Sequence, residues 1–67
     1  MTETALDMAE RHVREGQERL REQELLLDQL AERGPVYLIG LANQLLRSMQ
    51  DFQRIAEEHR DLLRELQ

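Results

Sequence analysis

The chain has no cysteine, tryptophan or lysine, and it contains only one proline, three glycines and two aromatic residues. Without cysteine it can form neither a disulfide nor a thiolate metal site. Its 67 residues allow one domain. A core of that size supplies only about 3–5 kcal/mol of stability unless something else contributes. Since disulfides and cysteine-ligated metals are excluded, we expect self-association to supply the rest.

Long apolar runs are also absent. The longest lies between Pro35 and Ala42, far short of the roughly 20 residues that a membrane span needs. Residues 1–33 are too polar for a signal peptide. The net charge of −5 argues against nucleic acid and anionic membranes as partners. We therefore expect a cytoplasmic protein that does not associate with membranes.

Two heptad repeats dominate the sequence, one on each side of Gly34-Pro35. Their members recur at alternating steps of three and four, the spacing with which one side of an α-helix faces a partner helix. In the first half these residues are Leu6, Ala9, Val13, Gly16, Leu20, Gln23, Leu27 and Leu30. In the second half they are Leu38, Ala42, Leu45, Met49, Phe52, Ala56, His59, Leu63 and Leu66. The pattern predicts an all-α fold, an antiparallel hairpin of two long helices.

The expected boundaries follow from helix-end signals. Thr2 or Thr4 can cap a first helix, and Thr4 with Asp7 three residues later resembles a capping box, so this helix is predicted over about 4–33. Gly34 suits the left-handed conformation that often ends a helix, and Pro35 cannot continue it. A second helix is then predicted over about 36–66. The whole chain, 1–67, forms a single domain with a turn at about 34–35, and such a short turn makes the helices antiparallel neighbours.

Folding at this turn predicts which residues face each other across the hairpin seam. Paired residue numbers sum to about 68 or 69, so Phe52 is expected opposite Gly16, where a missing side chain leaves room for the ring. Gln23 is expected opposite Leu45. There it either selects the register of the helices or reaches water at the seam edge, and both interpretations stay open.

The second helix carries more apolar surface than one seam uses. A stripe wider than a coiled-coil seam is typical of a helix that packs on two neighbours. We therefore predict that two hairpins related by a two-fold axis form a homodimeric four-helix bundle. The predicted dimer or partner face consists of Leu26, Ile39, Leu41, Leu46, Ile55 and Leu62.

The chain resembles a group of short, largely uncharacterised helical-hairpin proteins of alphaproteobacteria. The resemblance rests on Arg11-His12-Val13, Gly16, Gln23, Leu27, Gly34, Ala42, Leu45-Leu46, Met49 and His59-Arg60-Asp61-Leu62-Leu63. It implies a bacterial source and no known activity. The predicted architecture is also similar to Rop, a helical hairpin that dimerises and binds paired RNA loops. That similarity implies an RNA-binding dimer as an alternative function.

The two histidines are the candidate metal or pH-sensing groups. His59 is expected in the seam and His12 beside it. The Glu-x-x-His spacing of di-iron bundles is missing, because Ala9 and Ala56 stand three residues before the histidines. We therefore predict neither a metal nor a cofactor, and keep a metal-binding bundle as a lesser alternative. If His59 is buried and neutral, stability should fall below about pH 6.

Catalysis is not expected from this composition. The single serine, Ser48, has no triad context, and three scattered glycines cannot form a phosphate cradle. Arginines alternate with acids and only two aromatic rings are present, a pattern typical of a solvated face and not of an RNA platform. The predicted function is a small non-catalytic module for protein–protein interaction or regulation. Its predicted docking patch for another protein is the apolar tip, Val36, Tyr37, Leu38 and Ile39. The alternative is that Tyr37 and Ile39 only cap the end of the seam.

Overall fold

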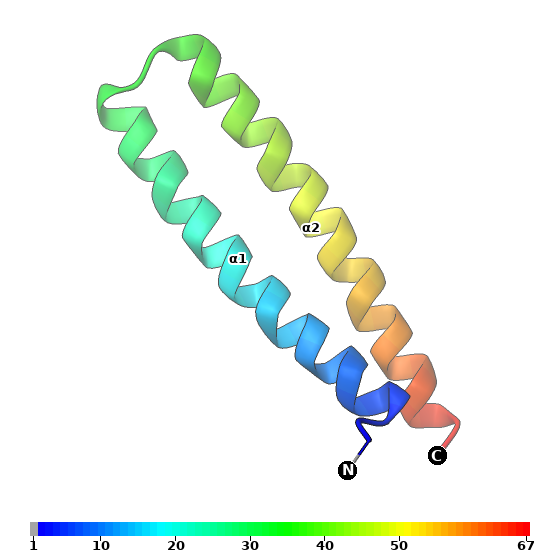
Figure 1. Cartoon of the computed structure of the whole chain (residues 1–67). Coiled ribbons are helices and arrows are strands. Elements are labelled where there is room, and N and C mark those ends of the chain that lie inside the picture. The colour runs from blue at the N-terminus through cyan, green and yellow to red at the C-terminus, as the bar shows by residue number, and fades with distance from the viewer. Residues whose placement is uncertain (1) are drawn as a thin grey trace.

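The computed structural model describes residues 2–67, which form an antiparallel hairpin of two helices (Figure 1). Helix α1 spans Ala5–Arg33 and helix α2 spans Val36–Glu65. Both ends of the chain lie at the end of the hairpin opposite the turn. The hairpin extends 48 × 21 × 12 Å, so it is a single layer of helices. The predicted all-α helical hairpin is therefore confirmed, and α2 ends one residue before its predicted boundary.

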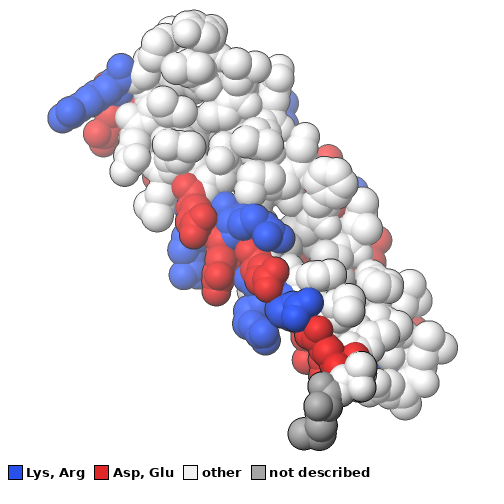
Figure 2. Space-filling view, viewed as in Figure 1, with Lys and Arg blue, Asp and Glu red and all other residues white. Residues whose placement is uncertain are grey.

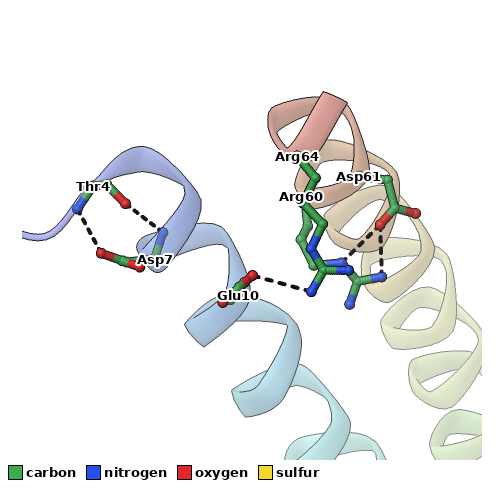
Figure 3. A network of polar contacts seen from close by, with 6 residues as sticks. All are labelled: Thr4, Asp7, Glu10, Arg60, Asp61 and Arg64. Carbon is green, nitrogen blue, oxygen red and sulfur yellow. Dashed lines mark hydrogen bonds and ion pairs between the residues drawn. The ribbon is translucent and has the colours of Figure 1, made fainter. Parts of the chain in front are cut away.

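Helix α1 begins with the predicted capping box. The Thr4 hydroxyl accepts a hydrogen bond from the Asp7 backbone N–H at 3.0 Å, and the Thr4 N–H donates to the Asp7 carboxylate at 3.3 Å (Figure 3). These bonds satisfy backbone donors that have no partner within the first helical turn. The Asp7 carboxylate also lies at the positive end of the helix dipole.

The turn at Gly34 differs from its prediction. Gly34 has φ −83° and ψ 157°, which is extended backbone, so the predicted left-handed conformation is wrong. Its N–H donates to the Leu30 carbonyl at 2.6 Å. A Cβ on Gly34 would lie 2.7 Å from that carbonyl oxygen and 3.0 Å from the Leu30 side chain. Glycine is needed here because the chain passes close to the end of α1.

Helix α1 faces α2 with the heptad stripe that its sequence predicts. Ala9, Val13 and Gln23 are buried. The remaining members of the stripe are partly buried, namely Leu6, Gly16, Leu20, Leu27 and Leu30. The spacing of three and four holds along the whole helix, so the seam of α1 is as predicted.

Helix α2 faces α1 with a different stripe from the predicted one. The predicted members Ala42, Met49, Ala56 and Leu63 are buried or partly buried, but Leu45, Phe52 and His59 are exposed. Their predicted seam positions are wrong. The next residue along the chain takes each place. The stripe that faces α1, here called the inner stripe, consists of Ile39, Ala42, Leu46, Met49, Gln53, Ala56, Arg60 and Leu63.

The core between the helices is small. Ala9, Val13 and Ala42 are the only buried apolar residues in the described part of the chain, and no large side chain within residues 2–67 is fully buried. Two of the five buried residues are the glutamines Gln23 and Gln53. One seam between two helices therefore shields little apolar surface from water.

Candidate protein interaction surface

A second heptad stripe runs along α2 beside the inner stripe. It is here called the outer stripe and consists of Leu41, Leu45, Ser48, Phe52, Ile55, His59, Leu62 and Leu66. Every member is exposed, and each stands one residue before a position of the inner stripe or, for Leu66, just beyond its end. One residue is a rotation of about 100° in an α-helix. The two stripes therefore point nearly at right angles, as they do for a helix at the corner of a four-helix bundle.

The outer stripe is apolar and open to solvent. Its most exposed ring is Phe52, which is 72% exposed, and Leu41, Leu45, Ile55 and Leu62 are each more than half exposed. Figure 2 shows this face of the hairpin: an uncharged strip follows α2 and the tip, whereas acidic and basic side chains cluster along α1. Contiguous apolar surface of this kind on a small protein is typical of an interaction site.

A groove between the helices borders the outer stripe. It is lined by His12, Gly16 and Arg19 of α1 and by Met49, Phe52, Gln53 and Ala56 of α2. Because Gly16 has no side chain, the apolar lining of the groove comes mainly from Met49 and Phe52 of α2. The groove and the outer stripe open on the same side of the hairpin and form one continuous surface.

Gln53 explains why Phe52 lies outside the seam. The Gln53 side-chain amide donates to the Val13 carbonyl of α1 at 2.8 Å and is buried. A Cβ on Gly16 would overlap Gln53 Oε1 and would lie 2.9 Å from its Cδ. The space at Gly16 is therefore used by a glutamine and not, as predicted, by the Phe52 ring.

Gln23 makes a matching contact nearer the tip. Its side-chain amide donates to the Ala42 carbonyl of α2 at 3.3 Å, and the residue is 9% exposed. The interpretation that it reaches water at the seam edge is therefore wrong, and it faces Ala42, not Leu45. Each helix thus sends one buried glutamine to a backbone carbonyl of the other helix. Because a buried amide without a partner is costly, these two bonds favour this register over shifted ones.

Charged residues tie the helices together at the open end. Arg64 of α2 lies 3.2 Å from the Glu10 carboxylate of α1 (Figure 3). Arg60 occupies an inner-stripe position, yet its guanidinium reaches outward to Asp61 at 3.0 Å. The Arg60 side chain is 22% exposed, so its stem covers the seam while its charge stays in water.

Four of the six residues of the predicted partner face have the exposure that the prediction requires. Leu26, Leu41, Ile55 and Leu62 are exposed as predicted. Ile39 and Leu46 are partly buried in the inner stripe, so their assignment to that face is wrong. The residues that sequence reasoning missed on this surface are Leu45, Phe52, His59 and Leu66, which it placed in the hairpin seam.

The predicted tip patch divides in the same way. Val36 and Tyr37 are exposed at 84% and 69%, whereas Leu38 and Ile39 are partly buried. Of the two residues expected to cap the seam, Ile39 is therefore partly buried as that interpretation requires, whereas Tyr37 is exposed and does not cap it. Val36 and Tyr37 leave an apolar surface at the end of the hairpin.

His59 does not occupy its predicted seam position, whereas His12 borders the seam as expected. His59 is exposed in the outer stripe, so the burial on which the expected acid sensitivity depended is absent. His12 is also exposed and lines the groove. Within residues 2–67, no three His, Asp or Glu side chains lie in a group that could hold a metal ion.

Comparison with known proteins gives no relative: no family model, no curated protein and no solved structure matches this chain. Neither helix of the described residues has the length and apolar character to cross a membrane. The outer stripe and the groove are the surface features of the hairpin that are suited to binding a partner.

Proposed function

We propose that the protein is a non-catalytic protein–protein interaction module that acts as a homodimeric four-helix bundle. The observation that carries this proposal is the outer stripe of α2. It has the spacing and the angle of a second helix-packing seam, and no helix of the hairpin packs on it. A cytoplasmic location belongs to the same proposal.

The exposed area of the hairpin supports a partner of considerable size. A compact monomer of 8.0 kDa exposes about 4,450 Å². The hairpin exposes 5531 Å², an excess of about 1,100 Å² over that expectation. A stable protein interface buries about 800 Å² on each partner. The excess is therefore sufficient for one such interface.

The small core of the single hairpin also supports a dimer, because it contributes little to stability. Ala9, Val13 and Ala42 bury few methyl groups between them. Ordering each residue costs about 1–2 kcal/mol of conformational entropy, which so few buried apolar groups do not offset. Burying the outer stripe against a second hairpin would add six large apolar side chains per copy, namely Leu41, Leu45, Phe52, Ile55, Leu62 and Leu66.

The charges favour a protein partner over RNA, the alternative implied by the similarity to Rop. Arg11 pairs with Glu3 at 3.0 Å and with Glu15 at 3.6 Å. Arg60 and Arg64 likewise pair with acids. Figure 2 also shows acidic side chains among the basic ones along α1, so the charged surface in this view is mixed, whereas phosphates bind best to a continuous basic surface. The metal-binding alternative has no supporting cluster in residues 2–67.

The tip is the proposed contact for a different protein once the dimer has formed. Val36 and Tyr37 lie outside both stripes of α2 and are the most exposed large apolar side chains near the turn. Tyrosine suits such contacts because its ring is apolar and its hydroxyl is polar. In this proposal the outer stripe holds the dimer together and leaves the tip residues free.

A pair of charge-matched double variants tests the proposal. Leu41→Glu with Ile55→Glu places two acids in the outer stripe, whereas Gln17→Glu with Gln50→Glu places two on exposed positions outside it. We expect sedimentation equilibrium to give a monomer for the first variant and a dimer for the second. Equal masses for the two variants would contradict the outer stripe as the interface, because both carry the same added charge.

A further inference from the structure

We propose that the two copies of the hairpin pair α2 against α2 in antiparallel orientation, with the two tips at opposite ends of the dimer. This inference rests on the homodimer proposed above and specifies its geometry. The two-fold axis crosses α2 between Gln53 and Arg54. Phe52 then faces Ile55 of the second copy, and Ser48 faces His59 of the second copy.

The order of residues in the outer stripe supports this pairing. Read from either end, the stripe has two leucines, one polar residue and one large apolar residue before its centre: Leu41, Leu45, Ser48 and Phe52 from one end, and Leu66, Leu62, His59 and Ile55 from the other. In a two-fold interface, if residue i contacts residue j, then j contacts i. When two copies of this stripe pack in antiparallel orientation, apolar residues therefore contact apolar residues and polar residues contact polar ones.

The place of α1 favours the antiparallel orientation independently. On each copy, α1 lies about 100° around α2 from the outer stripe, in the direction of increasing residue number. Reversing one α2 relative to the other brings both copies of α1 to the same side of the α2 pair, where they close a four-helix bundle. A parallel pair would place them on opposite sides. The parallel arrangement would therefore leave each groove facing solvent.

The groove gains a cover from the antiparallel arrangement. His12, Gly16 and Arg19 form its α1 wall, on the same side of the hairpin as the outer stripe. With both α1 helices on one side of the dimer, each groove faces the second copy. The exposed ring of Phe52, at the edge of the groove, then lies near the two-fold axis and between the two hairpins.

Charges beside the outer stripe are compatible with the same mirror relation. Arg54 and Asp51 lie next to the centre of the stripe, and Arg47 and Glu58 lie one turn further out. In the antiparallel pair, Arg54 comes near Asp51 of the second copy and Arg47 near Glu58 of the second copy. Opposite charges therefore meet at the rim of the interface, where they favour this orientation over mismatched ones.

Engineered cysteines test the pairing cleanly, since the chain has none of its own. The antiparallel pair places Ser48 beside His59 of the second copy, whereas two Ser48 residues lie about 16 Å apart along the axis. A disulfide needs Cα atoms within about 7 Å. We therefore expect Ser48→Cys and His59→Cys chains to form a mixed disulfide dimer under mild oxidation. Ser48→Cys alone should not cross-link, and efficient cross-linking of that single variant would overturn the pairing.

A distance measurement covers the case in which these substitutions disturb the interface. Val36 is 84% exposed at the tip, so Val36→Cys carries a spin label away from the outer stripe. The antiparallel dimer predicts a label separation of about 50 Å from the helical rise, and a parallel dimer one below about 25 Å. A dimeric mass with the short separation overturns the antiparallel pairing alone. A monomeric mass of the labelled protein overturns the homodimer, and this pairing with it.

Discussion

Phe52 offers the sharpest test of the packing described here, because it contributes little to the hairpin itself. Its side chain is 72% exposed, so Phe52→Ala should leave the fold of one hairpin unchanged. In the proposed dimer the ring lies between two copies. Burying a phenylalanine is worth about 1.5–3 kcal/mol, and the exposed 72% is most of that side chain. Each dimer loses two rings, so dimerisation should weaken by about 2–4 kcal/mol, which is roughly a 30- to 1,000-fold rise in the dissociation constant.

Sedimentation equilibrium over a concentration series measures this change directly. The matched control is Gln50→Ala, an exposed residue of α2 outside both stripes, which should leave the dissociation constant unchanged within about threefold. Circular dichroism at high concentration, where both variants are dimeric, should show equal helix content. A Phe52→Ala variant that dimerises as tightly as the control would refute the assignment of this ring to the interface.

Three further predictions concern the hairpin itself. In a urea titration, Gly16→Ala should lower the free energy of unfolding by about 1–2 kcal/mol, because the new Cβ displaces a buried amide. The control Gly40→Ala, whose new Cβ meets nothing within 4 Å, should raise the free energy of unfolding by up to about 1 kcal/mol. Gln53→Ala should destabilise the hairpin by about 1–2 kcal/mol, and by more than Gln23→Ala does, since the Gln53 hydrogen bond is 2.8 Å long and the Gln23 bond 3.3 Å. Thermal unfolding midpoints that are equal or in the reverse order would contradict this. Thr4→Ala should cost about 1 kcal/mol through the lost cap, whereas Thr4→Ser should retain stability, and equal losses for both would exclude capping as the cause.

Much of the hairpin follows from its sequence because α1 has only one apolar stripe. The heptad from Leu6 to Leu30 is the one apolar stripe that runs the whole length of α1, so the pattern alone predicts which side of α1 faces α2. The break at Gly34-Pro35 and the cap at Thr4 have equally local causes. For these features no knowledge of the rest of the chain is needed.

The facing side of α2 could not be predicted in the same way. Two adjacent stripes share the spacing of three and four, and Phe52 of the outer stripe is far more apolar than Gln53 of the inner one. The predicted seam therefore mixed the two stripes: it had the inner-stripe residues Ala42, Met49, Ala56 and Leu63 but took Leu45, Phe52 and His59 from the outer stripe. The hairpin instead uses Gln53, because Gly16 leaves room for its amide to reach a carbonyl of α1. The sequence does indicate that Gly16 leaves space for a large side chain of α2. It does not indicate whether a glutamine or a phenylalanine fills that space.

The same error also explains the incorrect assignments on the partner face. Once Phe52 and His59 are assigned to the seam, Leu46 and Ile39 remain for the outside. In the structure the next residue along the chain replaces each of Leu45, Phe52 and His59 in the seam, and the other predicted seam residues between Ala42 and Leu63 keep their places. The hydrophobic pattern thus indicated that α2 has more apolar surface than α1 covers, but polar contacts determine which side of α2 faces α1.

The mass of the unmodified protein in solution tests the central claim most directly. Sedimentation equilibrium over a range of concentrations should give twice the 8.0 kDa of one chain, with a single helical species. That result would support the outer stripe of α2 as the surface that joins two hairpins. A folded, helical species of 8.0 kDa at all concentrations would contradict it.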